Sequence, residues 1–257
     1  MFNDSIVIIK SYDYIQMEYE IKVLDINVPQ IRKKLKQMGC KKVHKAKKFR
    51  RNVYYLCDEK TDGFVRVRDE GANVTITTKI YKNKDFPQET EISIHEDFET
   101  ATRLLESMGF VHKAYQESIR EKYSHPLAHE IVIDNVPGIP PYMEIDCHTK
   151  ENLDKLIQLL DVDPKQIRTG SFDKQFLEYY GIEKQEFTNT KKLNFKEIRE
   201  QIKPKKNEKL FTKVTSKYND KYLNAADMPI KVINHVVTTK KCKKCKKGTR
   251  KKCVKNM

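Results

Sequence analysis

Apolar and charged side chains alternate in a short segment near the start of the chain. Its apolar positions are Tyr19, Ile21 and Val23, and its charged positions are Glu18, Glu20 and Lys22. This period of two predicts a β-strand with one apolar and one charged face. Carboxylates about 7 Å apart on one strand face repel each other and lose hydration unless a cation and an anion occupy the space beside them. The segment is therefore a candidate ligand-binding strand.

Three later segments repeat the pattern of a strand with one polar face. The polar positions are Arg66 and Arg68 in 64–68, Thr75, Thr77 and Lys79 in 74–80, and Glu144 and Asp146 in 142–147. Because so many strands turn charged faces one way, we expect a sheet that closes around a polar interior. Carboxylates suit Mg²⁺ or Mn²⁺, and Arg and Lys suit phosphate oxygens, so a metal-bound polyphosphate would satisfy both sets.

Other segments carry apolar residues at helical spacing. They predict helices over 28–39, 97–108, 150–160 and 173–180. Asn27 is the expected N-cap of the first helix, and glycines end the first two. Each of these two helices follows a strand with a Glu-x-Glu pair and precedes a longer strand. This arrangement predicts an internal twofold repeat of strand, helix and strands.

The charged motifs follow one another in a specific order along the chain. The residues are Glu18, Glu20 and Lys22; Arg66 and Arg68; Thr77 and Lys79; Glu89 and Glu91; Arg120; Asp134 and Gly138; Glu144 and Asp146; and the segment 171–177. In this order they resemble the motifs of the CYTH domain. This group of triphosphate tunnel metalloenzymes includes class IV adenylyl cyclases, thiamine triphosphatases and inorganic triphosphatases. The resemblance runs from about residue 17 to 180.

The resemblance implies a fold and a set of site residues. The implied fold is α+β, a closed antiparallel eight-stranded β-barrel (the triphosphate tunnel) with flanking helices. The implied catalytic residues, which would also bind Mg²⁺ or Mn²⁺, are Glu18, Glu20, Glu144 and Asp146. The residues implied to clamp the triphosphate are Lys22, Arg66, Arg68, Lys79 and Arg120. Glu89 and Glu91 are candidate metal ligands, general bases or partners of the basic residues, and Lys174 is a candidate supporting residue.

The same residues are compatible with more than one activity. Our first hypothesis is a divalent-metal-dependent phosphohydrolase that acts on inorganic triphosphate, thiamine triphosphate or a nucleoside or RNA 5′-triphosphate. The alternative is a class IV adenylyl cyclase, which converts ATP to cyclic AMP and pyrophosphate. It would need a nucleoside cleft, for which Phe49, Phe64 and Phe86 are candidates. A third hypothesis is a non-catalytic protein that binds polyphosphate or nucleic acid.

Charge is distributed unevenly along the 257 residues. Residues 191–257 contain 22 Lys and Arg but only 5 Asp and Glu, whereas the preceding part is close to neutral. We therefore divide the chain into an N-terminal extension (1–16), a tunnel domain (17–183) and a disordered Lys-rich linker and basic tail (184–257). The tail would attract RNA or DNA by charge. Its cysteines Cys242, Cys245 and Cys253 form at most a partial zinc motif.

The sequence contains no apolar run long enough to span a membrane and no secretory signal. We therefore expect a cytoplasmic protein, with the nucleus as an alternative because of the Lys runs. Either Met1 or Met17 is a candidate start. Cys40, Cys57 and Cys147 are expected to be reduced thiols. The sequence does not indicate an oligomeric state.

Overall fold

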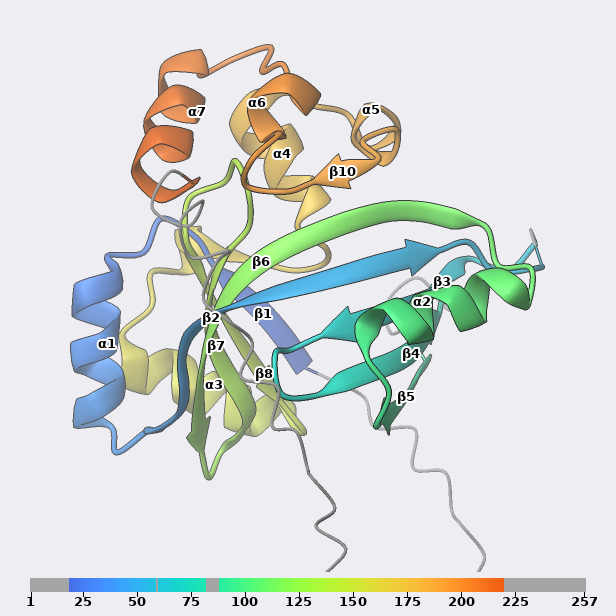
Figure 1. The fold of residues 1–257 in the computed structure, drawn as a ribbon. Helices are drawn as coiled ribbons and strands as arrows, with labels where there is room; N and C mark the ends of the chain where they lie inside the picture. The colour runs from blue at the N-terminus through green and yellow to red at the C-terminus, as the bar shows by residue number, and fades with distance from the viewer. Residues whose placement is uncertain (1–18, 59, 82–87, 220–257) are drawn as a thin grey trace, which may run out of the picture.

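The computed structural model describes residues 19–58, 60–81 and 88–219, and its centre is one strongly curved β-sheet (Figure 1). The strands are β1 (Tyr19–Val23), β2 (Lys41–Tyr54), β3 (Gly63–Asp69), β4 (Val74–Ile80), β5 (Gln88–Ile94), β6 (His112–His125), β7 (Ala128–Asn135), β8 (Tyr142–Cys147), β9 (Ile167–Arg168) and β10 (Lys192–Leu193). Their order in the sheet is β5-β4-β3-β2-β6-β7-β8-β1-β9, and β10 pairs with β6. All pairs are antiparallel except β6 with β10. The long strands β2 and β6 lie side by side at the middle of the sheet.

Helices surround this sheet on its outer side and at one end (Figure 1). They are α1 (Val28–Gln37), α2 (Phe98–Ser107), α3 (Lys150–Leu160), α4 (Asp173–Tyr180), α5 (Lys184–Thr188), α6 (Ile198–Gln201) and α7 (Glu208–Val214), with the short turns η1 (Pro164–Gln166) and η2 (Thr215–Asn219). The four predicted helices are confirmed as α1 to α4. Asn27 caps α1 by accepting a hydrogen bond from the Gln30 amide (3.2 Å), and Asp97 caps α2 from the Thr100 amide (2.6 Å).

The predicted internal repeat is present in the element order. Strand, helix and three strands (β1-α1-β2-β3-β4) are followed by the same series (β5-α2-β6-β7-β8). Each helix is followed by a glycine with positive φ, Gly39 at 78° and Gly109 at 91°, a conformation that other residues rarely adopt. The first strand of each repeat pairs with the last strand of the other, β1 with β8 and β5 with β4. The two halves are thus joined by exchanged strands.

The expectation of a closed eight-stranded barrel is wrong. Over the residues that the structure describes, the terminal strands of the sheet do not pair, and β9 and β10 bring the strand number to ten. At the edge of β1, Lys22 and Val23 already pair with Arg168 and Ile167 of β9, so this part of β1 is not available to another strand. Lys79 on β4 and Glu20 on β1 influence each other electrostatically across the gap. The sheet therefore curves around a polar interior without closing.

Three apolar clusters lie between the sheet and its helices. The first joins α1 and α3 to β1, β7 and β8, and includes Leu35, Met143 and Leu156, each fully buried. The second contains α4 to α7, and the third packs α2 against β3 through Phe98 and Leu105. Because the apolar face of the sheet is covered in this way, its charged face is left to line the interior.

Residues 184–219 differ from the disordered linker expected from their composition. Phe187, Leu193, Ile198, Ile202 and Phe211 are buried in the second apolar cluster, together with Leu24 and Tyr180 from the preceding part of the chain. The Tyr180 hydroxyl donates a hydrogen bond to the Gly138 carbonyl (2.6 Å) beneath this layer. Burial of these large side chains stabilises the segment despite its many lysines.

Several predicted features fall outside the residues that the structure describes. They are Glu18, Phe86, the extension 1–16 and the tail cysteines Cys242, Cys245 and Cys253. Among the described cysteines, Cys40, Cys57 and Cys147 are free thiols, as expected. No helix within the described ranges is long and apolar enough to cross a membrane.

A buried carboxylate on β6 ties α1 to the sheet and gives a testable pH dependence. Glu121 accepts hydrogen bonds from Arg32 of α1 (2.6 Å) and from Tyr123, and pairs with Lys42 (2.5 Å). Although burial raises its pKa, the hydrogen bonds from Arg32 and Lys42 hold the pKa of Glu121 below its ordinary value of 4.5. We expect Glu121→Gln to lower the free energy of unfolding at pH 7 by about 2 kcal/mol.

The pH dependence of this difference follows from the sign of the shift. A lowered folded-state pKa stabilises the protein above the ordinary glutamate pKa, and this contribution is lost as pH falls through the folded-state value. Urea unfolding at pH 7 and below pH 4.5 should therefore show the gap between wild type and Glu121→Gln shrinking on acidification. The exposed Glu96→Gln is the matched control. A gap that stays constant over this range would contradict the assignment.

Candidate active site

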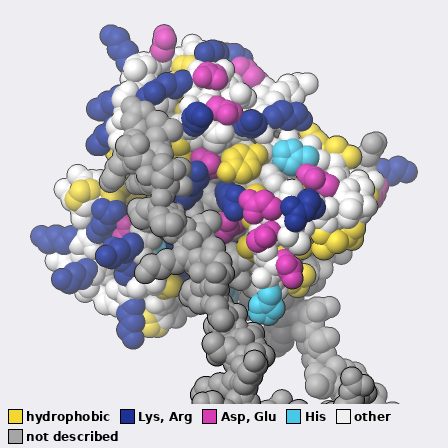
Figure 2. Space-filling view, viewed as in Figure 1, with side chains coloured by type: hydrophobic (Ala, Val, Ile, Leu, Met, Phe, Trp, Pro, Cys, Tyr) yellow, Lys and Arg dark blue, Asp and Glu magenta, His cyan; other side chains and the backbone are white. Residues whose placement is uncertain are grey.

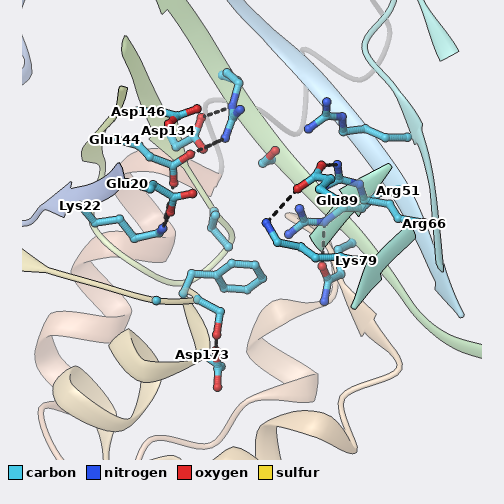
Figure 3. A pocket seen from close by; sticks show the side chains of 18 of the residues that line it. Glu20, Lys22, Arg51, Arg66, Lys79, Glu89, Asp134, Glu144, Asp146 and Asp173 are labelled. Carbon is cyan, nitrogen blue, oxygen red and sulfur yellow. Dashed lines mark hydrogen bonds and ion pairs between the residues drawn. The ribbon is translucent and has the colours of Figure 1, made fainter. Parts of the chain in front are cut away.

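The curved sheet encloses a cavity of about 2320 Å³. All eight strands from β1 to β8 contribute side chains to its surface, and residues of α3, α4 and α5 line it as well. Figure 3 shows two groups of charged residues that face each other across this space. We call them the acidic wall and the basic wall.

The acidic wall is formed by β1, β7 and β8. Its members are Glu20, Glu130, Asp134, Glu144 and Asp146. In the sheet register Asp146 lies between Glu20 and Glu130, and Glu144 lies opposite Lys22. Asp134, Glu144 and Asp146 are all buried. The period of two in 142–147 thus places two of the predicted acids on the cavity face beside a third from β1.

Two cations are embedded in the acidic wall. Lys22 pairs with Glu20 and lies 3.1 Å from Glu144. Arg120 binds Asp134 through two hydrogen bonds of 2.8 and 2.6 Å, and also contacts Glu130 (3.1 Å) and Glu144 (3.4 Å). The structure therefore places these two predicted phosphate ligands among carboxylates, on the side opposite the other basic residues.

This mixture of charges shifts the ionisation of the wall. Burial raises the pKa of Glu144, but Lys22 and Arg120 lower it more, to about 2. Burial and then the negative charge of Glu144 raise the pKa of Glu20 above its ordinary value, although Lys22 opposes this. Glu144 is thus ionised at neutral pH, while Glu20 bears a repulsion that a further cation would relieve.

The basic wall lies on β2, β3 and β4. Its members are Arg51, Arg66, Arg68 and Lys79, all of which face the cavity. In the register Arg51 is directly opposite Arg68, and Arg66 is opposite Thr77. Like charges at opposed positions destabilise a sheet unless an anion lies near them. This placement is a structural reason to expect a bound polyanion.

Glu89 and Glu91 of β5 belong with the basic wall. Glu89 lies 3.0 Å from Lys79 and 3.5 Å from Arg66, and Glu91 lies 3.3 Å from Arg66 and 3.5 Å from Arg68. Thr77 also donates a hydrogen bond of 2.6 Å to Glu91. Of the roles open to these two acids, the contacts favour that of partners that orient the basic side chains.

The negative charges of Glu89 and Glu91 do not fully balance the positive charge of the basic wall. Burial and then Arg68 lower the pKa of Arg66 to about 10, and burial and then Arg66 and Arg68 lower that of Arg51 to about 9. The buried Nε atoms of Arg66 and Arg68 have no hydrogen-bond acceptor within the described part of the chain. Phosphate oxygens are suitable acceptors for such guanidinium groups, so the wall fits a polyphosphate.

Arg51 and Glu130 were not found from the sequence. Arg51 stacks over Phe172 (5.3 Å to the ring centroid) and donates a hydrogen bond to Gln116 (2.8 Å). Its signal was the alternation along β2, in which Lys47, Phe49, Arg51 and Val53 all face the cavity. Glu130 gave a similar signal, because it and Asp134 lie an even number of positions apart on β7 and therefore share one strand face. The predicted supporting residue Lys174 lines the cavity from α4.

The acidic wall also fits a hard divalent cation by its donor chemistry. Glu20, Glu144 and Asp146 offer only oxygen ligands on neighbouring strands, and such ligands suit Mg²⁺ or Mn²⁺. No three His, Cys, Asp or Glu side chains in the described ranges are already grouped to hold an ion. Glu20 and Glu144 would therefore have to turn from their present partners Lys22 and Arg120 to bind one.

Comparisons with known proteins agree with this architecture. A family model described as the CYTH domain matches residues 16–174. A protein from Pyrococcus horikoshii OT3 is similar in structure, with a TM-score of 0.51, 18% identity and coverage of 62% of this chain and 98% of its own. A "putative adenylate cyclase" from Vibrio parahaemolyticus has a TM-score of 0.52 at 16% identity, covering 62% and 97%. A search of curated protein sequences gives no match.

Proposed function

Because this chain belongs to the CYTH domain family, we propose that it is a divalent-metal-dependent phosphohydrolase that acts on a triphosphate bound between the two walls. The family is metal-dependent and binds triphosphate substrates. The observation that carries the proposal is the opposition of the walls across one cavity, shown in Figure 3. A chain of phosphates needs cationic contacts along its oxygens and a cation to neutralise the remaining charge.

Each wall has a distinct role in this proposal. Arg51, Arg66, Arg68 and Lys79 bind phosphate oxygens, and the planar guanidinium groups can do so through two hydrogen bonds each. Glu89 and Glu91 keep Arg66, Arg68 and Lys79 oriented before the substrate arrives. Preoriented donors stabilise the charge that develops during phosphoryl transfer without having to reorganise.

Glu20, Glu144 and Asp146 would hold the divalent cation. When bound, such a cation neutralises phosphate oxygens and lowers the pKa of a coordinated water molecule. Lys22 and Arg120 keep the carboxylates close together in its absence, because their positive charges offset the mutual repulsion. Hydrolysis at the terminal phosphorus would release orthophosphate.

The adenylyl cyclase alternative requires a nucleoside site in the same cavity. Phe64 and Tyr81 line it beside Lys79 at the basic wall, and Phe49 lines it from β2. These rings could accept a base, which is why ATP has to be included in any test. The similar protein from Vibrio parahaemolyticus bears a cyclase description, but that likeness concerns the fold alone.

One experiment distinguishes these activities. The purified chain is incubated with inorganic triphosphate, thiamine triphosphate or ATP, each with Mg²⁺, with Mn²⁺ or with EDTA, and orthophosphate, pyrophosphate and cyclic AMP are measured together. We expect metal-dependent release of orthophosphate that EDTA abolishes. Pyrophosphate together with cyclic AMP would establish the cyclase instead, and tight triphosphate binding without any product would establish a non-catalytic protein.

A further inference from the structure

Residues 28–48, which form α1 and the first half of β2, contain nine basic residues and no acidic one. The basic residues are Arg32, Lys33, Lys34, Lys36, Lys41, Lys42, Lys45, Lys47 and Lys48. Lys and Arg side chains gather over the position of α1 when the surface is viewed as in Figure 1 (Figure 2). We call this surface the α1–β2 face. Its charge belongs to the folded part of the chain and is separate from the basic tail.

Part of this charge has structural partners and part does not. Arg32 and Lys42 pair with Glu121, and Lys48 lies 2.6 Å from Glu117. Lys33, Lys36, Lys41 and Lys45 are exposed and have no acidic partner among the residues with assigned positions. These four lysines are therefore available for a polyanion.

The β2 part of the α1–β2 face continues into the cavity. Strand β2 continues from Lys41 through His44 and Lys47, which line the cavity, to Arg51 in the basic wall. Lys122 of β6 is opposite His44 in the register and lines the same entrance. The rings of His44 and Phe49 lie 5.8 Å apart, and the Lys47 ammonium lies 5.3 Å from the Phe49 ring centroid. Basic side chains with aromatic rings between them are typical of single-stranded nucleic acid binding.

We propose that the α1–β2 face binds the backbone of a single-stranded RNA whose 5′-triphosphate occupies the cavity. This inference rests on the proposed function and specifies its substrate class. RNA is the polyanion that begins with a triphosphate, and one strand can follow the track of lysines and enter the cavity. An anionic membrane is too broad to follow β2 inward, although it would be attracted by the same charge.

The test compares two variants of equal charge. One carries Lys33→Gln, Lys36→Gln, Lys41→Gln and Lys45→Gln, and the control carries four exposed substitutions elsewhere: Lys155→Gln, Lys196→Gln, Lys209→Gln and Lys213→Gln. Binding of a short RNA with a 5′-triphosphate, and of the same RNA with a 5′-hydroxyl, is measured in EDTA by fluorescence anisotropy over a range of salt. Hydrolysis of inorganic triphosphate is measured separately.

We expect the α1–β2 variant to bind the triphosphate RNA at least about 10-fold more weakly than the control, with a salt slope reduced by up to about 3, because each lost phosphate contact on a single strand removes about 0.7. Its turnover of inorganic triphosphate should equal that of the control. A cavity variant, Arg66→Gln, should lose the preference for triphosphate over hydroxyl RNA.

Three results would overturn the inference. Equal RNA affinity of the two variants would mean that the lysines only protect the free edge of β2, since β3 pairs with residues 50–54 alone. Equal affinity of wild type for triphosphate and hydroxyl RNA would separate the face from the cavity. Binding to phosphatidylserine vesicles is measured for the same variants. If the α1–β2 variant lost vesicle binding but kept its RNA binding, the face would be assigned to membranes. If the protein hydrolysed none of the substrates but still bound triphosphate RNA through these lysines, only the proposed phosphohydrolase activity would be refuted.

Discussion

Replacement of Glu144 by glutamine is expected to reduce the metal-dependent hydrolysis of inorganic triphosphate by about 10²–10³-fold, the loss typical for removal of one preorganised electrostatic group. Glu144 is buried, ionised at neutral pH and central to the acidic wall, so its charge cannot be supplied by water. Glutamine preserves the shape of the side chain. Lys22 retains Glu20 as a partner and Arg120 retains Asp134, so the fold should persist.

The measurement is kcat and KM for inorganic triphosphate at several Mg²⁺ and Mn²⁺ concentrations. We expect the variant to require more metal and to remain slow when metal is saturating, because the negative charge of Glu144 is missing from the acidic wall. The KM should change little, because the substrate contacts of the basic wall are unchanged. Glu106→Gln on the exposed surface of α2 is the matched control. Thermal unfolding verifies that both variants are folded. Turnover within about threefold of wild type would remove Glu144 from the proposed site.

The local features of the fold could be predicted from the sequence because they depend on neighbouring residues. The period of two in 142–147 fixed which side chains of β8 face the cavity, and Asn27 and Asp97 marked the starts of two helices. The motif order then suggested which strands carry the site. Burial follows the alternation in β4, where Thr75 and Thr77 are buried and their neighbours are less so, but not in β8, whose six residues are all buried.

Features that depend on distant parts of the chain could not be predicted in this way. Closure of the sheet depends on what occupies the edge of β1, and β9 lies more than a hundred residues further along. Arg51 became a site candidate only when β3 placed Arg68 opposite it. Likewise, the placement of Arg120 among acids reflects its pairing with Asp134 of β7, which a motif in one strand does not show.

The internal repeat explains why the two walls have opposite charge. Equivalent strands of the two halves carry different side chains: β3 contributes Arg66 and Arg68, whereas its counterpart β7 contributes Glu130 and Asp134. Exchange of β1 and β5 between the halves adds Glu20 to the acidic wall and places Glu89 and Glu91 within the basic wall. A symmetric backbone thus presents an asymmetric charge distribution, which matches a ligand that combines a cation with an anionic chain.

Replacement of Phe211 by alanine tests whether residues 184–219 are part of the folded domain. Phe211 is 5% exposed, and its ring lies 5.2 Å from that of Tyr180 in an edge-to-face arrangement. Loss of a buried phenylalanine costs about 3–5 kcal/mol. For a domain of this size that corresponds to a fall of roughly 6–20 °C in Tm.

The control is Lys209→Ala, a substitution of an exposed residue on the same helix, α7. Alanine favours the helix, so this variant should unfold within about 2 °C of wild type. Both are followed by circular dichroism during heating and by urea unfolding. A linker of the kind predicted from the lysine content would give the same small effect for both variants. A large effect of Phe211→Ala alone would mean that α4 to α7 stabilise the second apolar cluster. They would then also stabilise the neighbouring strands β7 and β8, which carry Asp134 and Glu144.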